Sequence, residues 1–294
     1  MKENGNTGHW EKVKTDKGKP ESWVKRLLHQ NRKYAEVAKI TYKAQLAWRF
    51  DIAFNMAFTI IKILFAYIIW GTIFGERETV AGFQFDSMLS YYIISSFLSQ
   101  MEMSDGVSGE ISGRIREGSF SKYMVVPIHI ERYFLAQTWG AASFYSLFNL
   151  GAAAVWVFLF GIRFTFTYNT GVIVLSIIMI LMGLIFMVQL NYFLGILTLK
   201  FQDIQLFLMI KNSLVAFITG TMLPLSLLPA AVTSVMRFFP FYYVTYLPSM
   251  LLLGQNTGEG IQGLFILAGW NVLFMVLNKI TYNRLRVRYE GVGI

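Results

Sequence analysis

ISGRIREGSFSKYMVVPIHIERYFLA, residues 111–136, interrupts a chain that is otherwise largely apolar. The stretch contains four Lys and Arg residues, two glutamates, two glycines and one proline. Long apolar windows lie on both sides of it. A charged segment with turn-forming residues between two such windows is typical of a connector between membrane-spanning helices.

The composition of the chain indicates an integral membrane protein. Hydrophobic residues make up 55% of the 294 residues, charged residues only 15%, and the mean hydropathy is +0.48. A water-soluble domain usually has about a quarter charged residues. The net charge of +9 would suggest an acidic partner in a soluble protein, but here it fits basic loops that stay in the cytoplasm. We therefore expect the lipid bilayer, and no nucleic acid, as a partner.

Six apolar windows are long enough to cross about 30 Å of hydrocarbon. A seventh stretch, FYYVTYLPSMLLLG at 241–254, contains Pro248 and is short for a span. Because three more prolines precede it, we expect a re-entrant region over about 229–254. The predicted fold is all-α and integral to the membrane, with a transmembrane domain at 51–288. The six predicted spans are 52–74, 88–109, 134–160, 171–199, 205–228 and 261–281.

The first 50 residues divide into a polar tail and an amphipathic helix. Residues 1–22 are polar, with Gly, Lys and Pro, and are expected to form a flexible cytoplasmic tail. Residues 23–50 have apolar and aromatic side chains opposite a charged helix face, which is typical of a helix that lies in the membrane interface. An ordinary solvated helix before the first span would give the same pattern. The charged face consists of Arg32, Glu36, Lys39 and Lys43.

The distribution of Lys and Arg predicts the orientation of the chain. The first 50 residues contain 12 of them, and others lie in 111–136, near Lys200 and at the C-terminal end. The alternate loops contain only Arg77, Arg163 and Arg237. Because basic loops stay in the cytoplasm, both ends of the chain and residues 111–136 should be cytoplasmic. Two cytoplasmic ends require an even number of spans, which favours six over seven.

The sequence contains no complete catalytic motif. The pattern GxxxxGK[ST] is absent, so this chain is not expected to hydrolyse ATP. The three histidines are scattered and cysteine is absent, so no metal site is expected. Asp105–Gly106 resembles the start of the CDP-alcohol phosphatidyltransferase motif, but Gly109–Glu110 stand where those enzymes have Ala-Arg. A membrane-bound lipid-modifying enzyme is therefore only a second alternative.

The second apolar window has an unusually polar face. Ser95, Ser99 and Glu102 recur at helical spacing, and Asp105 lies beside them. Acidic groups at membrane depth are costly and usually face a bundle interior or water. This face is expected to line a conduit or a subunit seam, unless its carboxylates lie in the cytoplasmic headgroup zone. Lys62, near the middle of the first window, is expected to face the bundle interior, where it could pair with Glu102.

This layout resembles an ABC-2 type transporter permease, the membrane subunit of a type V-like ABC exporter. The shared features are the amphipathic N-terminal helix, the six spans, the charged segment after the second span and the re-entrant region. Within 111–136 the family pattern corresponds to Ile111, Gly118, Tyr123 or Met124, and Pro127. The segment REGSFSKYMVVPI is similar in sequence to the corresponding segment of one subgroup of this family. In that subgroup two different permeases are often encoded together with one ATPase.

The resemblance implies a partner and a role for each cytoplasmic segment. Two ATPase subunits would carry ATP and Mg, and this chain would bind no cofactor. A second permease chain would complete the complex in a bacterial cytoplasmic membrane. The resemblance favours a heterodimer of two different permeases over a homodimer. A coupling helix would contact the ATPase through Arg116, Glu117, Gly118, Phe120, Lys122, Tyr123, Met124 and Pro127. A second contact would involve Lys200, Asp203 and Gln205, and the conduit or seam would involve Ser95, Ser99, Glu102 and Asp105.

The residues of 111–136 agree with a docking helix. Gly109, Gly113 and Gly118 could end the second span, and Pro127 could start the next helix. Phe120, Tyr123 and Met124 are expected to fill a partner pocket inside a charged rim. The first alternative function is an ion-coupled secondary transporter or channel, which would favour an inverted repeat and carboxylates deep in several spans.

Overall fold

The computed structural model describes residues 23–75, 77–159, 161, 163–221 and 224–289. These residues fold into helices and contain no β-strand, apart from an isolated bridge between Val80 and Phe83. The prediction of an all-α fold is therefore confirmed. The predicted tail, 1–22, lies outside the described residues. The main helices are α1 Trp23–Gln45, α2 Arg49–Phe74, α3 Phe85–Met101, α4 Asp105–Arg116, α5 Ser121–Val125, α6 Ile130–Leu159, α7 Thr170–Phe201, α8 Gln205–Ile218, α9 Ala230–Met236, α10 Leu247–Leu252 and α11 Gly260–Leu285.

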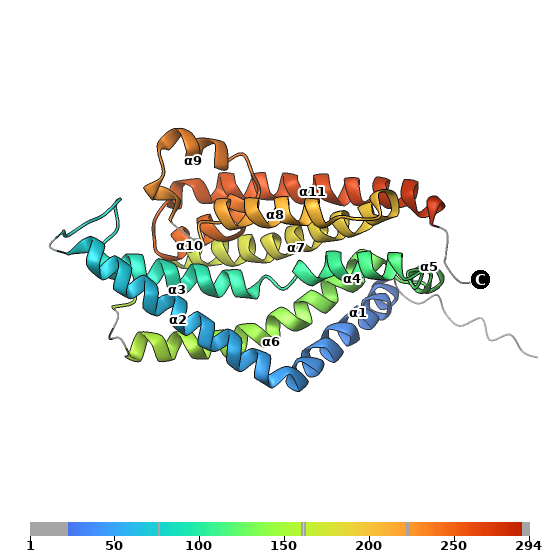
Figure 1. Ribbon diagram of the computed structural model, residues 1–294, viewed down its shortest axis with the longest axis horizontal. Helices are drawn as coiled ribbons and strands as arrows, with labels where there is room; N and C mark the ends of the chain where they lie inside the picture. The colour runs from blue at the N-terminus through green and yellow to red at the C-terminus, as the bar shows by residue number, and fades with distance from the viewer. Residues whose placement is uncertain (1–22, 76, 160, 162, 222–223, 290–294) are drawn as a thin grey trace, which may run out of the picture.

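Helices α7 and α11 run along the longest axis of the molecule, whereas α1 and α2 run obliquely to it (Figure 1). Helix α7 lies beside α4, α10 and α11, and α1 turns back from the start of α2 to run along α6. Helix α5 and the C-terminal end of α11 lie at one end of the molecule, which we call the α5 end. Helix α9 and the loop between α2 and α3 lie toward the opposite end.

Three segments of the described chain are long and apolar enough to cross a membrane. They are Ala57–Phe74 in α2, Thr170–Phe201 in α7, and Thr257–Leu285, which contains α11. Helix α8 is apolar but has only 14 residues. The predicted fifth span, 205–228, therefore ends early, at Ile218. A turn at Gly220 follows, where φ is +70° and the Tyr91 hydroxyl donates to the carbonyl oxygen over 2.8 Å.

The predicted second span is broken. Residues 102–104 are not helical, and they separate α3 from α4, which lie end to end (Figure 1). The glycines expected to end this span do not do so, because Gly109 and Gly113 lie inside α4. Gly118 does follow the end of α4, with a left-handed φ of +74° that an L side chain rarely adopts.

The region predicted as re-entrant consists of short helical segments, of which α9 is largely exposed and residues 240–251 are buried against α3, α7 and α11. A π-helical turn, Tyr242–Tyr246, leads directly into α10. Its backbone approaches α7 so closely that a Cβ on Gly183 would lie 3.2 Å from the Cα of Val244. The core around it is largely aromatic and includes Tyr91, Phe186, Tyr242 and Tyr246. This packing fixes the wall of the cavity described below.

Helix α1 is amphipathic, and its apolar side packs on α6. The four predicted charged side chains are all exposed, and the ring of Tyr42 meets that of Phe144 edge-on at 5.2 Å. The two backbones nearly touch, because a Cβ on Gly140 would lie 2.2 Å from the carbonyl oxygen of Ala38. Any larger residue at this glycine would push the helices apart.

Candidate functional site

The break between α3 and α4 is held by a carboxylate. Ser104 donates its backbone N–H to Glu102 Oε1 over 2.9 Å, and its hydroxyl donates to the same oxygen. A helix N-terminus has N–H groups without helical partners and a partial positive charge. Glu102 therefore satisfies one of the donors that the break leaves free and places a negative group near the start of α4.

A chain of polar contacts continues from this break into α7 and α8. The Asn191 amide donates to Ser104 Oγ over 2.7 Å and accepts from Lys211 Nζ over 3.2 Å. Lys211 also forms an ion pair with Asp105 Oδ1 at 2.5 Å. The side chain of Lys211 is only 6% exposed, whereas that of Asp105 is 67% exposed. The lysine is thus buried and depends on these two partners for its charge.

A cavity of about 240 Å³ adjoins this polar chain. Ser99, Glu102 and Asp105 line one side of it, and polar residues of α8 and the following turn line another. Thr245, on the π-helical turn, is 4% exposed, and its hydroxyl forms no hydrogen bond with the described residues. The other polar lining residues are Asn212, Thr219 and Thr221.

Three of the four predicted conduit residues lie together at this cavity, and the fourth does not. Ser95 is buried within α3, and its hydroxyl faces the carbonyl oxygen of Tyr92. Both serines precede the break, and helical spacing alone did not show that Ser95 is buried while Ser99 faces the cavity. Sequence reasoning also missed Lys211 and Asn191. The signal was present, since Lys211 is the only charged residue of the apolar helix α8, but its charge was attributed to the preceding loop.

The hypothesis that Lys62 faces the bundle interior is wrong. Its side chain is exposed on α2, on the outside of the described chain. The basic side chain near Glu102 is instead Lys211, which lies on the neighbouring helix α8. The sequence of an apolar span does not show whether a lysine in it is buried or which helix it packs against. For this reason the prediction paired Glu102 with Lys62 and not with Lys211.

The predicted coupling segment contains α5, which is folded back onto α6 and α7. Phe120 is fully buried and Tyr123 is 9% exposed, in a cluster with Phe134, Tyr192 and Ile196. The expectation that Phe120 and Tyr123 are free to fill a partner pocket is therefore wrong. Their rings instead pack against α6 and α7 and fix the segment to these helices.

Polar contacts around Tyr123 fix the same segment. Its hydroxyl lies 3.2 Å from Glu110 Oε1, which also forms an ion pair with Arg114 at 2.9 Å. Gln137 donates from α6 to the other oxygen of Glu110 over 3.3 Å. Burial, and then the negative charge of Glu110, raise the pKa of Tyr123 well above its usual range, so its hydroxyl remains a donor.

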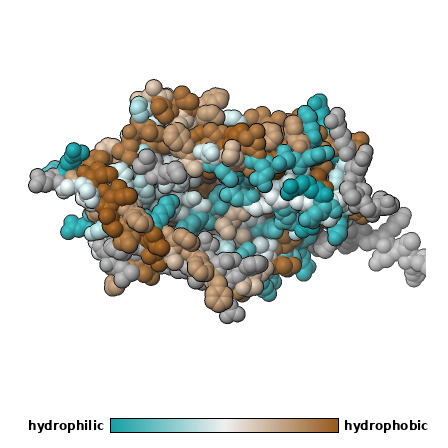
Figure 2. Space-filling model, in the orientation of Figure 1, coloured by the Kyte–Doolittle hydropathy of each residue, from teal (hydrophilic) through white to brown (hydrophobic). Residues whose placement is uncertain are grey.

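The outer side of the segment is a small apolar patch with a charged rim. Met124, Val125 and Val126 are 36%, 83% and 49% exposed. The rim consists of Arg116, Glu117 and Lys122, which are exposed, and Pro127 follows the patch, also exposed. We call Met124, Val125 and Val126 the outer patch. Figure 2 shows hydrophilic residues gathered over α4, whereas α2 and α8 present mainly hydrophobic ones.

Helix α1 is tied to the connector that follows the outer patch. Lys33 Nζ donates to the carbonyl oxygen of Pro127 over 2.7 Å, and the backbone N–H of His129 donates to the Tyr34 hydroxyl over 2.9 Å. The turn between α7 and α8, predicted as a second contact, exposes Lys200, Asp203 and Gln205. Asp203 closes this turn by accepting from the N–H of Gln205 over 2.8 Å.

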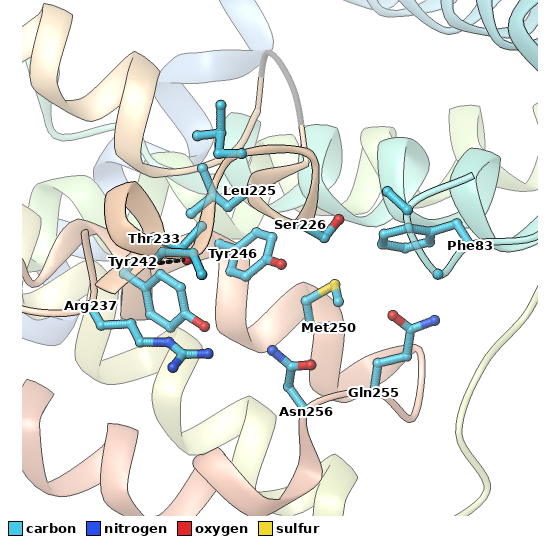
Figure 3. A pocket seen from close by; sticks show the side chains of 14 residues that line it. Phe83, Leu225, Ser226, Thr233, Arg237, Tyr242, Tyr246, Met250, Gln255 and Asn256 are labelled. Atoms are coloured by element: carbon cyan, nitrogen blue, oxygen red, sulfur yellow. Dashed lines mark hydrogen bonds between the residues drawn. The ribbon is translucent and has the colours of Figure 1, made fainter. Parts of the chain in front are cut away.

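A second cavity, of about 430 Å³, lies near α9 and the segment after α10 (Figure 3). Arg237, Tyr242 and Tyr246 point toward it, opposite Gln255 and Asn256. Arg237 forms an ion pair with Glu259 at 2.7 Å, and Tyr242 donates to the other oxygen of Glu259 over 3.0 Å. These contacts connect the segment after α9 to the residues just before α11.

The described residues contain no group of three His, Cys, Asp or Glu side chains that could hold a metal ion. A family model described as an ABC-2 family transporter protein matches residues 60–293, which is most of the chain. No curated protein matches the chain. The matched range includes both cavities, the outer patch and every helix from α3 to α11.

Proposed function

The chain belongs to the ABC-2 family of transporter proteins, and we propose that it is the permease subunit of an ATP-driven exporter. Such a subunit binds and passes a substrate while a separate ATPase hydrolyses ATP with Mg. We propose six spans, formed by α2, α3, α6, α7, α8 with the segment after it, and α11, with a re-entrant region at 229–254. Both termini and the α5 end would be cytoplasmic, in a bacterial cytoplasmic membrane, since the basic residues gather there.

The outer patch is the proposed contact with the ATPase. Exposed apolar side chains inside a charged rim are the usual composition of a recognition surface. Phe120 and Tyr123 act behind it as positioning residues, because they anchor α5 to α6 and α7. The exposed turn at Lys200, Asp203 and Gln205 is the proposed second contact. Two ATPase copies and a second, different permease chain would complete the complex.

The observation that carries the proposal is the ion pair between Asp105 and Lys211. Helix α4 is continuous from Asp105 to Arg116, next to the coupling segment, so a displacement of α5 moves the carboxylate of Asp105. The break at 102–104 lets α4 move without carrying α3 with it. Because Lys211 belongs to α8, the ion pair transmits that movement to a second membrane helix.

Helix α8 is well suited to receive the movement. It packs little against the other helices of its own chain, and Leu206, Met209 and Phe217 are more than half exposed. The polar cavity lies between α8 and the break, so a shift of α8 would change its width. We propose that this cavity belongs to the export path, at the seam with the second permease chain.

Co-purification tests the proposed function. The tagged chain, expressed with candidate ATPase subunits, should retain a soluble ATPase through membrane extraction and chromatography. Val125→Asp should release this ATPase, while Tyr168→Asp, a change at an exposed residue in the loop between α6 and α7, should not. An ion-coupled transporter or a lipid-modifying enzyme would need no ATPase, and normal transport without one would contradict the proposal.

A further inference from the structure

A third cavity lies at the α5 end and is separate from the polar break. It has a volume of about 730 Å³ and is lined by α5, the connector after it, the start of α6, α7 and α11. Ligand sites commonly have volumes of roughly 300–1,000 Å³. None of the residues at the break in α3 and α4 lines this cavity. Its lining therefore needs an explanation of its own.

The floor of this cavity has hydrogen-bond acceptors without donors. Asn278 is 1% exposed and Gln189 is 7% exposed, and the side-chain oxygens of both have no hydrogen-bond partner among the described residues. Glu131 lies beside these two amides, whose side chains hydrogen-bond to it, and it forms none of the ion pairs found in the described chain. A buried acceptor without a donor costs about 1–3 kcal/mol. A ligand with several N–H donors and a positive charge would remove that cost.

The rim of the cavity has the opposite charge. Arg132, Lys279 and Arg286 line it, and all three side chains are exposed. Basic side chains at the cytoplasmic end of membrane helices lie at the level of lipid phosphates. The cavity thus places cations at its mouth and a carboxylate with two amide oxygens at its floor.

Apolar side chains also line part of the cavity. Leu135, Ile185 and Met275 line the cavity, and Met275 is 54% exposed on α11. A ligand that uses the whole cavity needs a phosphate, a primary ammonium group near it, and an attached hydrocarbon chain. A soluble phosphate ester would leave the apolar wall in contact with water.

We propose that this cavity binds a phospholipid of the inner leaflet whose headgroup ends in a primary ammonium, as in phosphatidylethanolamine. The phosphate would pair with Lys279 and Arg286, and the ammonium would donate to Glu131 and the amide oxygens of Gln189 and Asn278. The residues that would contact the headgroup all belong to one chain, and Met124 and Val126 of the outer patch also line the cavity.

Native mass spectrometry of the purified chain tests the assignment. The chain is offered equal amounts of phosphatidylethanolamine, phosphatidylcholine and phosphatidylglycerol with identical acyl chains. Phosphatidylcholine is the matched control, because it keeps the phosphate and the positive charge but has no N–H donor. Adducts of phosphatidylethanolamine should exceed those of phosphatidylcholine by about tenfold or more, since charge-assisted hydrogen bonds contribute about 1.5–3 kcal/mol.

Variants separate the floor from the rim. Glu131→Gln should reduce the preference for phosphatidylethanolamine over phosphatidylcholine to near parity, and Glu36→Gln, the same change on the exposed face of α1, should keep it. Replacing Lys279 and Arg286 together by Ala should weaken both lipids alike, since both have the phosphate. The comparison of lipids on the unmodified chain decides the question even where a variant does not fold.

Three results would overturn the assignment. Equal binding of phosphatidylethanolamine and phosphatidylcholine would show that the floor does not recognise N–H donors. Preference for phosphatidylglycerol would show that a cationic group is not required. Displacement of the bound lipid by water-soluble phosphoethanolamine at equal concentration would show that the cavity takes a free headgroup and ignores the acyl chains.

Discussion

Lys211 Nζ and Asp105 Oδ1 lie 2.5 Å apart, although 106 residues separate them in the sequence. The pair is unequal, because the lysine is buried and the aspartate is largely exposed. It joins the helix that leads into the coupling segment to the helix that borders the polar cavity. The predictions below test this connection and the packing that supports it.

The two halves of the ion pair should differ in their effect on stability. Asp105→Asn removes the ion-pair partner of the buried Lys211 and leaves Asn191 and Glu102 near it, so it should cost about 1.5–3 kcal/mol, the range for a hydrogen bond to a charged group. Lys211→Met leaves Asp105 exposed to solvent, so its cost should be clearly smaller. Thermal unfolding in detergent would rank the two variants. The reverse order would mean that Asp105, and not Lys211, is the buried charge.

Phe120 and Val125 should separate packing from docking. Phe120→Ala removes a fully buried ring, and such changes cost about 3–5 kcal/mol. Val125→Asp changes an exposed residue, and its effect on unfolding should stay within about 0.5 kcal/mol. Only Val125→Asp should lose the ATPase while remaining folded. A stable Phe120→Ala variant that fails to bind the ATPase would instead place the ring on the docking surface.

Gly140 should be required for the contact between α1 and α6. A Cβ at this position would lie 2.2 Å from the carbonyl oxygen of Ala38, so Gly140→Ala should cost about 1–3 kcal/mol. Gly151→Ala is the matched control on the same helix, because nothing lies within 4 Å of its added Cβ. That change should be neutral or stabilising by up to about 1 kcal/mol. Equal unfolding temperatures for the two variants would contradict the close packing of α1.

Tyr123 should make the fold sensitive to alkaline pH. Because burial raises its pKa above the ordinary value near 10, the stability that its neutral form contributes is complete below about pH 10 and is lost as the pH rises further. Tyr123→Phe should therefore lose less stability than the unmodified chain between pH 9 and about pH 11. Tyr168→Phe, at a residue that is 95% exposed, should change nothing. Identical pH profiles for all three proteins would mean that Tyr123 ionises freely.

The sequence predicted the helices well, because long apolar windows set where α2, α6, α7 and α11 can form. It missed the break after α3, since residues 102–104 contain no proline or glycine and the polar face was consistent with a continuous helix. Helical spacing identified Glu102 and Asp105 as candidate residues of the polar cavity. It did not identify Lys211, because an ion pair between helices that are distant in sequence leaves no local sequence pattern. The burial of Phe120 was missed for a similar reason: α5 has only five residues, which is too short to show a buried face.

The central claim is that the ion pair between Asp105 and Lys211 transmits movement from the coupling segment to α8. The most direct test is the ATPase rate of the assembled complex, measured with the unmodified chain, Asp105→Asn, Lys211→Met and the double variant. Each single change should abolish most of the stimulation that the chain gives its ATPase, with the ATPase still bound, and the double variant should lose no more than either one. Full stimulation with Asp105→Asn, or losses that multiply in the double variant, would contradict the claim.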